Sequence, residues 1–249
     1  MNRTSDYQFT IIVPFYNEAD NVSAMERNLT AFLPQCAMSP ACVLFVNDGS
    51  TDDGGELVKE LCGRHKDFFY IGLERNTGLS GALKAGFENC FSPYLGYIDA
   101  DFQTDAMDFN LLLQYAGEYE MVTGIRAKRN DGFVKRASSR FANSFRRAFT
   151  HDGVSDTGCP LKVIRTDIAR KFPMFNGMHR FMPALTQMVG GRVKQVEVRH
   201  YPRMAGSSKY HLFNRILGPL GDCFAFRWMN KRYIDYKITD KTFLEPEGR

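Results

Sequence analysis

Long apolar segments are absent from this 249-residue sequence. No window approaches the roughly 18 uninterrupted apolar residues of a membrane-spanning helix, and the polar residues 1–10 lack the apolar centre of a secretory signal peptide. We therefore expect a cytoplasmic chain that is neither exported by a signal peptide nor anchored by its own helix. The hydrophobic residues, 44% of the total, nevertheless suffice for one large core.

A strong charge of either sign is also missing. The 32 Lys and Arg residues exceed the 28 Asp and Glu residues by only four, which is too few to indicate a dedicated nucleic-acid binder. The six cysteines include no C-x-x-C pair and lie mostly in apolar runs, so we predict reduced core residues. The five histidines show no zinc-site spacing.

Short apolar runs alternate with longer amphipathic segments, a pattern typical of an α/β fold with a mostly parallel sheet flanked by helices. Strands are predicted at residues 9–13, 42–46, 68–73, 94–98, 121–124, 161–164 and 193–200. Helices are predicted at residues 21–33, 53–61, 79–90, 107–115, 135–149 and 212–229. The pattern therefore indicates a single catalytic domain with a C-terminal arm.

An acidic cluster follows the predicted strand at residues 94–98. In an open parallel sheet, ligands bind beyond the carboxyl ends of the strands. Asp99 and Asp101 are two residues apart, so in extended backbone both carboxylates point to the same side, with Gln103 beside them. These oxygens suit Mg²⁺ or Mn²⁺. The alternative for a bare D-x-D is a solvated turn that caps a helix beginning near Asp105.

Two further polar clusters follow the first and second predicted strands, at residues 14–18 and 47–52. No G-x-G-x-x-G or G-K-[ST] motif is present, so neither a dinucleotide fingerprint nor a Walker A loop is predicted. The turn at residues 78–81 could bring a helix N-terminus near a phosphate, although glycine in a turn is usually only conformational. The candidate site therefore lies at one edge of the sheet.

The order of the motifs resembles one known family. P-x-Y-N-E, N-D-G-S-x-D, N-x-G-x-x-x-A and D-A-D-x-Q occur in the order found in the family 2 glycosyltransferases of the GT-A fold. The later D-T-G-C-P-L-K (156–162) and R-x-x-G-x-S-K (203–209) resemble the polyprenol-phosphate glycosyltransferases, the dolichol-phosphate mannose synthase-like group. The resemblance implies a Rossmann-like GT-A catalytic domain over residues 1–210 and an amphipathic helix with a polar tail over residues 211–249.

The resemblance also implies residue roles. The nucleotide-sugar would be held by Pro14, Tyr16, Glu18, Val46, Asp48, Asp99, Ala100 and Asp101. The metal, Mg²⁺ or Mn²⁺, would be held by Asp99, Asp101 and Gln103. The catalytic set would be Asp101, Arg126, Arg203 and Lys209, with the three cations around the phosphates. The lipid phosphate would be received by Arg126, Lys135, Arg136, Ser139 and Ser208. Two positions depart from the family pattern, Asn47 where an Asp is common and Thr104 where His or Asp often follows the Gln.

The implied reaction is the inverting transfer of a hexose-type sugar from a nucleotide diphosphate-sugar to a polyprenyl (undecaprenyl or dolichyl) phosphate. An alternative is transfer to a saccharide hydroxyl in cell-envelope polysaccharide or lipid-linked glycan synthesis, for which Asp152 and Asp156 are weak candidates as the base. A non-catalytic nucleotide- or lipid-binding subunit is disfavoured by the intact metal ligands. Trp228 stands in a sequence similar to the Q-x-x-R-W of processive synthases, but the Gln is missing, which favours a single transfer.

Two amphipathic segments indicate contact with a membrane surface. Between residues 126 and 147 there are many basic residues and a single acid, Asp131. In the same segment and just after it, Phe141, Phe145 and Phe149 form an apolar stripe. This segment could lie on an anionic membrane or pack on the core with its basic face solvated. The segment at residues 212–229 would lie at the interface or contact an integral-membrane partner or a second subunit. We expect a peripheral protein on the cytoplasmic face of the membrane.

Overall fold

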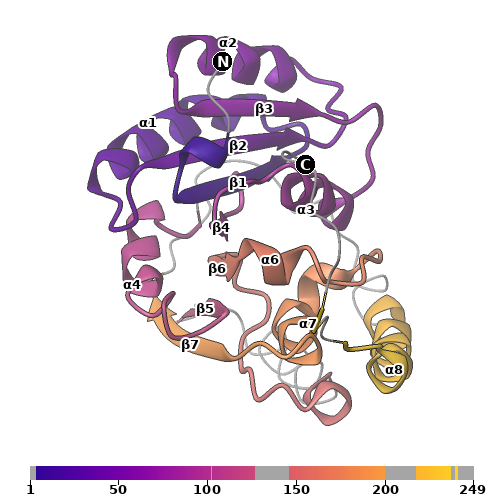
Figure 1. The fold of residues 1–249 in the computed structure, drawn as a ribbon. Helices are drawn as coiled ribbons and strands as arrows, with labels where there is room; N and C mark the ends of the chain where they lie inside the picture. Colours follow the sequence, from indigo (N-terminus) through magenta and orange to yellow (C-terminus); the bar gives the residue numbers. More distant parts are fainter. Residues whose placement is uncertain (1–3, 102, 127–145, 200–216, 237–238, 241–249) are drawn as a thin grey trace.

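A single seven-stranded sheet organises the computed structural model. The model describes residues 4–101, 103–126, 146–199, 217–236 and 239–240. The strands are β1 (Phe9–Phe15), β2 (Ala41–Asn47), β3 (Phe68–Gly72), β4 (Tyr94–Tyr97), β5 (Met121–Arg126), β6 (Lys162–Arg165) and β7 (Val193–Val198). Their order is β3-β2-β1-β4-β6-β5-β7, from top to bottom in Figure 1. Of these strands β6 alone runs antiparallel to its neighbours, so the predicted mostly parallel sheet is confirmed.

Helices cover both faces of the sheet, as Figure 1 shows. One face carries α1 (Val22–Phe32), α2 (Gly54–Arg64) and α4 (Phe109–Leu113). The other carries α3 (Leu79–Glu88), α6 (Thr166–Ala169), α7 (Met182–Met188) and α8 (Leu217–Arg232). Short 3₁₀ helices are η1 (Thr4–Asp6), η2 (Ala19–Asn21), η3 (Leu33–Gln35), η4 (Ala106–Asp108) and η5 (Met178–Arg180). Because both faces are covered, β1 and β2 are buried along their whole length, which explains their continuous apolar runs.

All seven predicted strands exist, with ends shifted by one or two residues. β1 runs two residues beyond its prediction and includes Pro14. β1 pairs with β4 only as far as Ile12, so at Pro14 the strand has a partner on the β2 side alone. A residue without a backbone N–H is tolerated where one side of a strand is unpaired.

The predicted helix at residues 135–149 lies mostly outside the described residues; residues 146–150 are helical. The prediction for residues 212–229 corresponds to α8, which packs on the core through Cys223 and Phe226, each 2% exposed. The Phe226 ring stacks on Phe181 with centroids 5.6 Å apart. The proposed boundary at residue 210 also falls outside the described part and stays a prediction.

All six cysteines are free thiols and five are buried, in line with the predicted reduced core residues. No helix in the described part of the chain combines the length and apolar character that crossing a membrane requires.

Candidate active site

Asn17 joins the loops that follow β1 and β2. Its backbone has a φ of 52°, a left-handed conformation that asparagine adopts more readily than most residues. Its Oδ1 accepts a hydrogen bond from the backbone N of Thr51 at 2.7 Å, and its own backbone N donates to Oγ of Ser50 at 3.0 Å. The two polar clusters predicted from the sequence therefore form one unit, in which Tyr16 and Glu18 are partly exposed.

Asp48 fixes the start of α3. Asp48 is 4% exposed, and its Oδ1 accepts hydrogen bonds from the backbone N of Thr77 at 2.8 Å and from the Thr77 hydroxyl at 2.7 Å. Thr77 precedes Gly78, whose φ of 78° is in the region that favours glycine. Asp48 thus holds the first turn of α3 against the end of β2, while its predicted contact with a nucleoside remains a prediction.

The residues of β2 that precede Asp48 make their contacts within the protein. Asn47 donates from Nδ2 to the hydroxyl of Tyr70 at 2.9 Å and accepts from the backbone N of Ser50 at 2.8 Å. Val46 is completely buried, and Pro14, its register partner in β1, is also buried. The predicted contact of Val46 and Pro14 with a nucleoside remains a prediction.

The acidic cluster lies directly beyond β4, as predicted. Burial raises the pKa of Asp99 to about 6; a hydrogen bond from the hydroxyl of Tyr97 to Oδ1 opposes this shift, and the nearby charge of Asp101 adds to it. Asp101 is partly exposed, and its Oδ1 accepts from the backbone N of Gln103 at 3.2 Å. Ala100 between them is 6% exposed.

This pair of carboxylates fits a divalent cation. Two acidic groups that repel one another, one of them with a raised pKa, gain stability when a cation lies between them. The described residues contain no group of three or more His, Cys, Asp or Glu side chains that could hold a metal. The protein's share of a site here is therefore two carboxylates, with Gln103, water and phosphate oxygens left to complete the shell, as Mg²⁺ commonly requires.

Arg126 ends β5 in a bidentate ion pair with Asp156. Nε and Nη2 of Arg126 donate to the two carboxylate oxygens at 2.8 and 2.7 Å, and both side chains are about one-tenth exposed. Asp152, the other weak candidate for a general base, has a side chain that is 0% exposed and pairs with Arg146. Because each carboxylate is held by a guanidinium, neither is suited to take a proton from an acceptor hydroxyl.

Lys162 is a site residue for which the sequence analysis assigned no role. It begins β6 opposite Tyr97 of β4 and is 1% exposed. Its Nζ lies 5.7 Å from the centroid of the Tyr97 ring and donates to the carbonyl oxygen of Cys159. Burial lowers the pKa of Lys162, whereas the charges of Asp156 and Asp99 raise it. The signal available in the sequence was a lysine within the otherwise apolar strand predicted at residues 161–164.

The remaining predicted phosphate-binding residues, Arg203, Lys209, Lys135, Arg136, Ser139 and Ser208, lie outside the described residues. The structure brings together Asp99, Asp101, Arg126 and Lys162, since Asp99 interacts electrostatically with each of the other three. Thr104 is 1% exposed, so its side chain is in the core rather than at the metal position.

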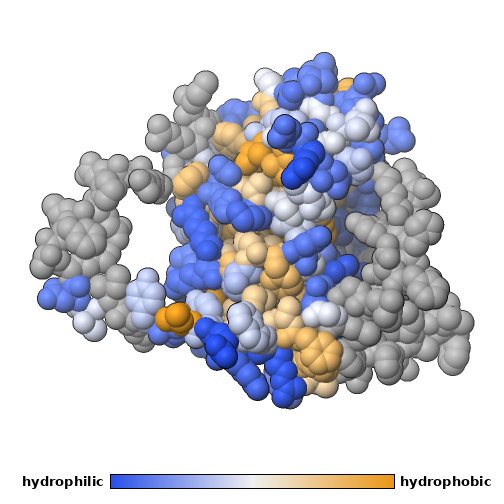
Figure 2. Space-filling model, turned by 90° about the vertical axis from the view of Figure 1, so that its right-hand side faces the viewer, coloured by the Kyte–Doolittle hydropathy of each residue, from blue (hydrophilic) through white to orange (hydrophobic). Residues whose placement is uncertain are grey.

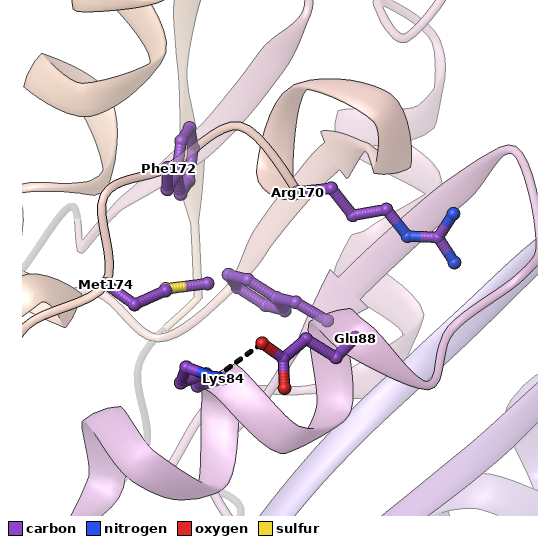
Figure 3. Close-up of a pocket in the computed structure, with 6 residues that line it drawn as sticks. Lys84, Glu88, Arg170, Phe172 and Met174 are labelled. Carbon is purple, nitrogen blue, oxygen red and sulfur yellow. Dashed lines mark hydrogen bonds and ion pairs between the residues drawn. The ribbon is translucent and has the colours of Figure 1, made fainter. Parts of the chain in front are cut away.

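A hollow of about 520 Å³ lies away from these residues, between α3 and the chain after α6 (Figure 3). It is lined by Lys84, Phe87, Glu88, Arg170, Phe172 and Met174. Lys84 and Glu88 pair across one turn of α3 at 2.5 Å, and Arg170 points away from them. None of the predicted site residues lines this hollow.

The family model for glycosyl transferase family 2 matches residues 10–172, about two thirds of the chain. The chain belongs to glycosyl transferase family 2. The match includes the loops after β1 and β2, the N-terminus of α3 and the acidic pair after β4. The family 2 membership predicted from the motifs is thus confirmed.

Curated relatives of this family 2 transferase are undecaprenyl-phosphate 4-deoxy-4-formamido-L-arabinose transferases. The protein of Pectobacterium carotovorum is 28% identical over 209 residues, which covers 83% of this chain and 64% of that protein. The protein of Edwardsiella ictaluri is 29% identical with the same coverage. The chain therefore spans slightly less than two thirds of the length of these relatives.

Solved structures confirm the GT-A fold. A mannosyltransferase from Pyrobaculum calidifontis in complex with GDP-Man and Mn²⁺ has a TM-score of 0.64 at 17% identity, covering 95% of this chain and 66% of its own. Glucosyl-3-phosphoglycerate synthase from Mycobacterium tuberculosis, solved with Mn²⁺ and UDP-glucose, has a TM-score of 0.63 at 12% identity, with 92% and 80% coverage. At these identities the likeness shows the fold alone.

Proposed function

We propose that this family 2 glycosyltransferase moves a sugar from a nucleotide diphosphate-sugar to a polyprenyl phosphate, with inversion at the anomeric carbon. The observation that carries the proposal is the pair Asp99 and Asp101 beyond β4, next to Arg126 and Lys162. The curated relatives, matched along 83% of the chain, are named as undecaprenyl-phosphate sugar transferases and support the class of acceptor.

A divalent ion, Mg²⁺ or Mn²⁺, held by Asp99, Asp101 and Gln103 would neutralise charge on the leaving nucleoside diphosphate. The solved relatives with Mn²⁺ support an ion of this kind. Arg126 and Lys162, whose charges act on Asp99, add positive potential that would stabilise negative phosphate groups. Tyr97 orients the Asp99 carboxylate through its hydroxyl.

The acceptor requires no general base. A phosphate monoester is already ionised near neutral pH, so its oxygen can attack the anomeric carbon directly. This agrees with the ion pairs that occupy Asp152 and Asp156. Transfer to a saccharide hydroxyl would instead require a positioned base, and the described residues offer neither of the two candidates for that role.

A lipid acceptor implies a membrane surface as a partner, and we place the protein peripherally on its cytoplasmic face. The side of the molecule that carries α8 in Figure 1 shows apolar residues bordered by hydrophilic ones in Figure 2. On α8, Phe224 and Trp228 are 61% and 64% exposed, among the exposed cations Arg227, Lys231 and Arg232. Aromatic and basic side chains together are typical of a helix at a lipid interface. An integral-membrane partner or a second copy of the chain is the alternative occupant.

The test is a transfer assay with the purified protein. A panel of UDP- and GDP-sugars is incubated with Mg²⁺ or Mn²⁺ and a short-chain polyprenyl phosphate, and products are read by mass spectrometry. We expect a polyprenyl phosphate-sugar from one donor. Sugar transfer to added saccharides with none to polyprenyl phosphate would reject the proposal in favour of the hydroxyl-directed reaction.

A further inference from the structure

Two side chains beside the candidate active site, Ser80 and His179, have no part in the mechanism above. Ser80 lies on the first turn of α3 and is 5% exposed. His179 lies in η5 and is partly exposed. The Ser80 hydroxyl oxygen lies 2.9 Å from Nδ1 of His179, although the two residues are 99 positions apart in the chain.

The hydrogen bonds around Ser80 bear on which nitrogen of His179 carries the proton. The backbone N–H of Gly177 donates to the Ser80 hydroxyl oxygen at 3.0 Å. That oxygen is thus an acceptor toward Gly177, and it keeps its proton and a second lone pair, so toward Nδ1 of His179 it can donate or accept, depending on the tautomer. A neutral imidazole whose Nδ1 accepts a hydrogen bond carries its proton on Nε2. With Ser80 as the donor to Nδ1, Nε2 of His179 is a hydrogen-bond donor.

The surroundings of His179 keep the ring neutral. Burial, followed by the positive charges of Arg180 and Lys162, lowers the pKa of His179 to about 3. Near neutral pH the ring consequently has one N–H group, which is on Nε2 when Ser80 donates to Nδ1.

His179 lies at the candidate site. Lys162, whose charge acts on His179, also lies over the ring of Tyr97, and the hydroxyl of Tyr97 binds Asp99. The helix that carries Ser80 starts at the turn held by Asp48. Within the described residues no side chain or carbonyl accepts a hydrogen bond from Nε2, and this atom is not among the buried atoms that lack a partner. Nε2 is thus open to a ligand.

We propose that the Ser80 hydroxyl donates to Nδ1 of His179 and so acts as a positioning residue, and that Nε2 of His179 donates a hydrogen bond to a hydroxyl or amide oxygen of the donor sugar. The inference rests on the proposed function, because it assumes a nucleotide-sugar bound at the candidate active site. The diphosphate would have charged partners in Arg126 and in a metal held by Asp99 and Asp101. A neutral N–H instead selects an oxygen by its position, and a sugar that lacks this oxygen leaves a polar group unpaired.

The first experiment observes His179 directly in the full-length protein. Nitrogen NMR on protein with ¹⁵N-labelled histidine, in the presence of Mg²⁺, should show His179 as the Nε2–H tautomer, and Ser80→Ala should remove this preference. Addition of UDP or GDP alone should leave the Nε2 signal in place. Addition of the matching nucleotide-sugars should move it. His65, which pairs with Glu26 on the surface, is the control in the same spectra.

The second experiment separates the sugar from the rest of the donor. His179→Ala should lower kcat/KM for the nucleotide-sugar by about 10- to 100-fold, because one positioned hydrogen bond to the substrate is lost. The affinity for the nucleoside diphosphate should stay within about twofold of wild type, as expected when binding of that part of the donor is untouched. His179→Gln keeps an amide donor and should recover part of the activity, and His65→Gln should leave activity unchanged.

Three results would overturn the assignment. The first is a His179 signal that the nucleoside diphosphate shifts as much as the nucleotide-sugar does. The second is a His179 signal that none of the nucleotide-sugars shifts, although transfer is normal. The third is full activity of His179→Ala. Failure of the proposed function is a different outcome. In that case no sugar reaches polyprenyl phosphate, while the NMR titration still reports whether the sugar of a bound donor meets His179.

Discussion

Arg199 binds Asp108 through three hydrogen bonds. The backbone N of Arg199 donates to Oδ2 of Asp108 at 2.7 Å, and Nε and Nη2 donate to Oδ1 at 2.9 and 2.7 Å. Asp108 is 1% exposed and lies in η4, shortly after the acidic pair, whereas Arg199 follows β7. The end of β7 is thus fixed to η4 just before the chain continues to Arg203 and Lys209, which lie outside the described residues.

Asp108→Asn should weaken this anchor. The buried amide would accept fewer of the three hydrogen bonds, so we expect a loss of about 1–3 kcal/mol in the free energy of unfolding. Misplacement of the residues that follow Arg199 should lower kcat/KM by about tenfold. Urea unfolding and the transfer assay measure both effects.

The matched control for Asp108→Asn is Asp167→Asn. Asp167 pairs with Arg165 at 2.6 Å, but that pair is on the surface, with side chains 53% and 41% exposed. Its loss should change stability by less than about 1 kcal/mol. Equal stability and activity of the two variants would refute the anchoring role of Asp108.

Asp101→Asn should abolish most of the transfer and leave the fold intact. Asp101 is partly exposed beyond the end of β4, so the substitution removes a charged metal ligand without opening the core. We expect a fall in kcat of about 10²-fold or more, in line with a metal that supplies several kcal/mol at the transition state. Asp20→Asn, an exposed substitution after β1, is the control. Normal turnover of Asp101→Asn with Mg²⁺ would remove the metal assignment.

The raised pKa of Asp99 predicts competition between protons and metal. Its pKa in the folded protein, about 6, lies above the ordinary value of 3.8, so the folded state binds this proton more tightly than the unfolded state does. Ionised Asp99 therefore costs stability above pH 6 when no metal is bound, and this cost disappears as the pH falls from 6 toward 4. Metal requires the ionised form, so Mn²⁺ affinity should fall by about tenfold between pH 7 and pH 5.

Electron paramagnetic resonance titrations of Mn²⁺ measure this pH dependence. Tyr97→Phe provides a matched variant, since the Tyr97 hydrogen bond opposes the rise in the pKa of Asp99. Its loss should move the decline in affinity to higher pH. An affinity for Mn²⁺ that is constant from pH 7 to pH 5 would contradict the prediction.

The main effect of Asp156→Asn should be a lower free energy of unfolding. It would leave the guanidinium of Arg126, whose side chain is 11% exposed, without its charged partner. Removal of one member of a buried ion pair costs about 3–5 kcal/mol. Urea unfolding should show this loss, and the double variant Asp156→Asn/Arg126→Met should recover part of it. If Asp156 were a general base, turnover would collapse while the unfolding curve stayed in place.

The strands could be predicted from sequence because a strand buried on both faces is a continuous apolar run, as in β1 and β2. The acidic pair could be predicted because it directly follows such a run, at the edge where parallel strands bind ligands. α6 and α7 were missed because they have four and seven residues, too few to display a helical period.

The partners of charged site residues were not predictable, because they depend on contacts between distant segments. Arg126 meets Asp156 from 30 positions away, and Ser80 meets His179 from 99. The position of Lys162 opposite Tyr97 follows from the antiparallel placement of β6 between β4 and β5, which no local pattern reveals.

Membrane association should depend on the exposed aromatic side chains of α8. Trp228 is 64% exposed, and the guanidinium of Arg232 lies 5.9 Å from its ring centroid, so an apolar surface and a positive charge occur side by side. Such a helix binds through shallow insertion of aromatic rings and attraction to anionic lipid. Sedimentation with anionic vesicles should therefore capture the wild-type protein, and about 0.5 M salt should release at least part of it because salt screens the charges. Trp228→Ser should lower the bound fraction several-fold, whereas Leu57→Ser, at a 39% exposed position on α2, should not. Equal binding of both variants and wild type, or release by detergent alone, would exclude α8 as the contact.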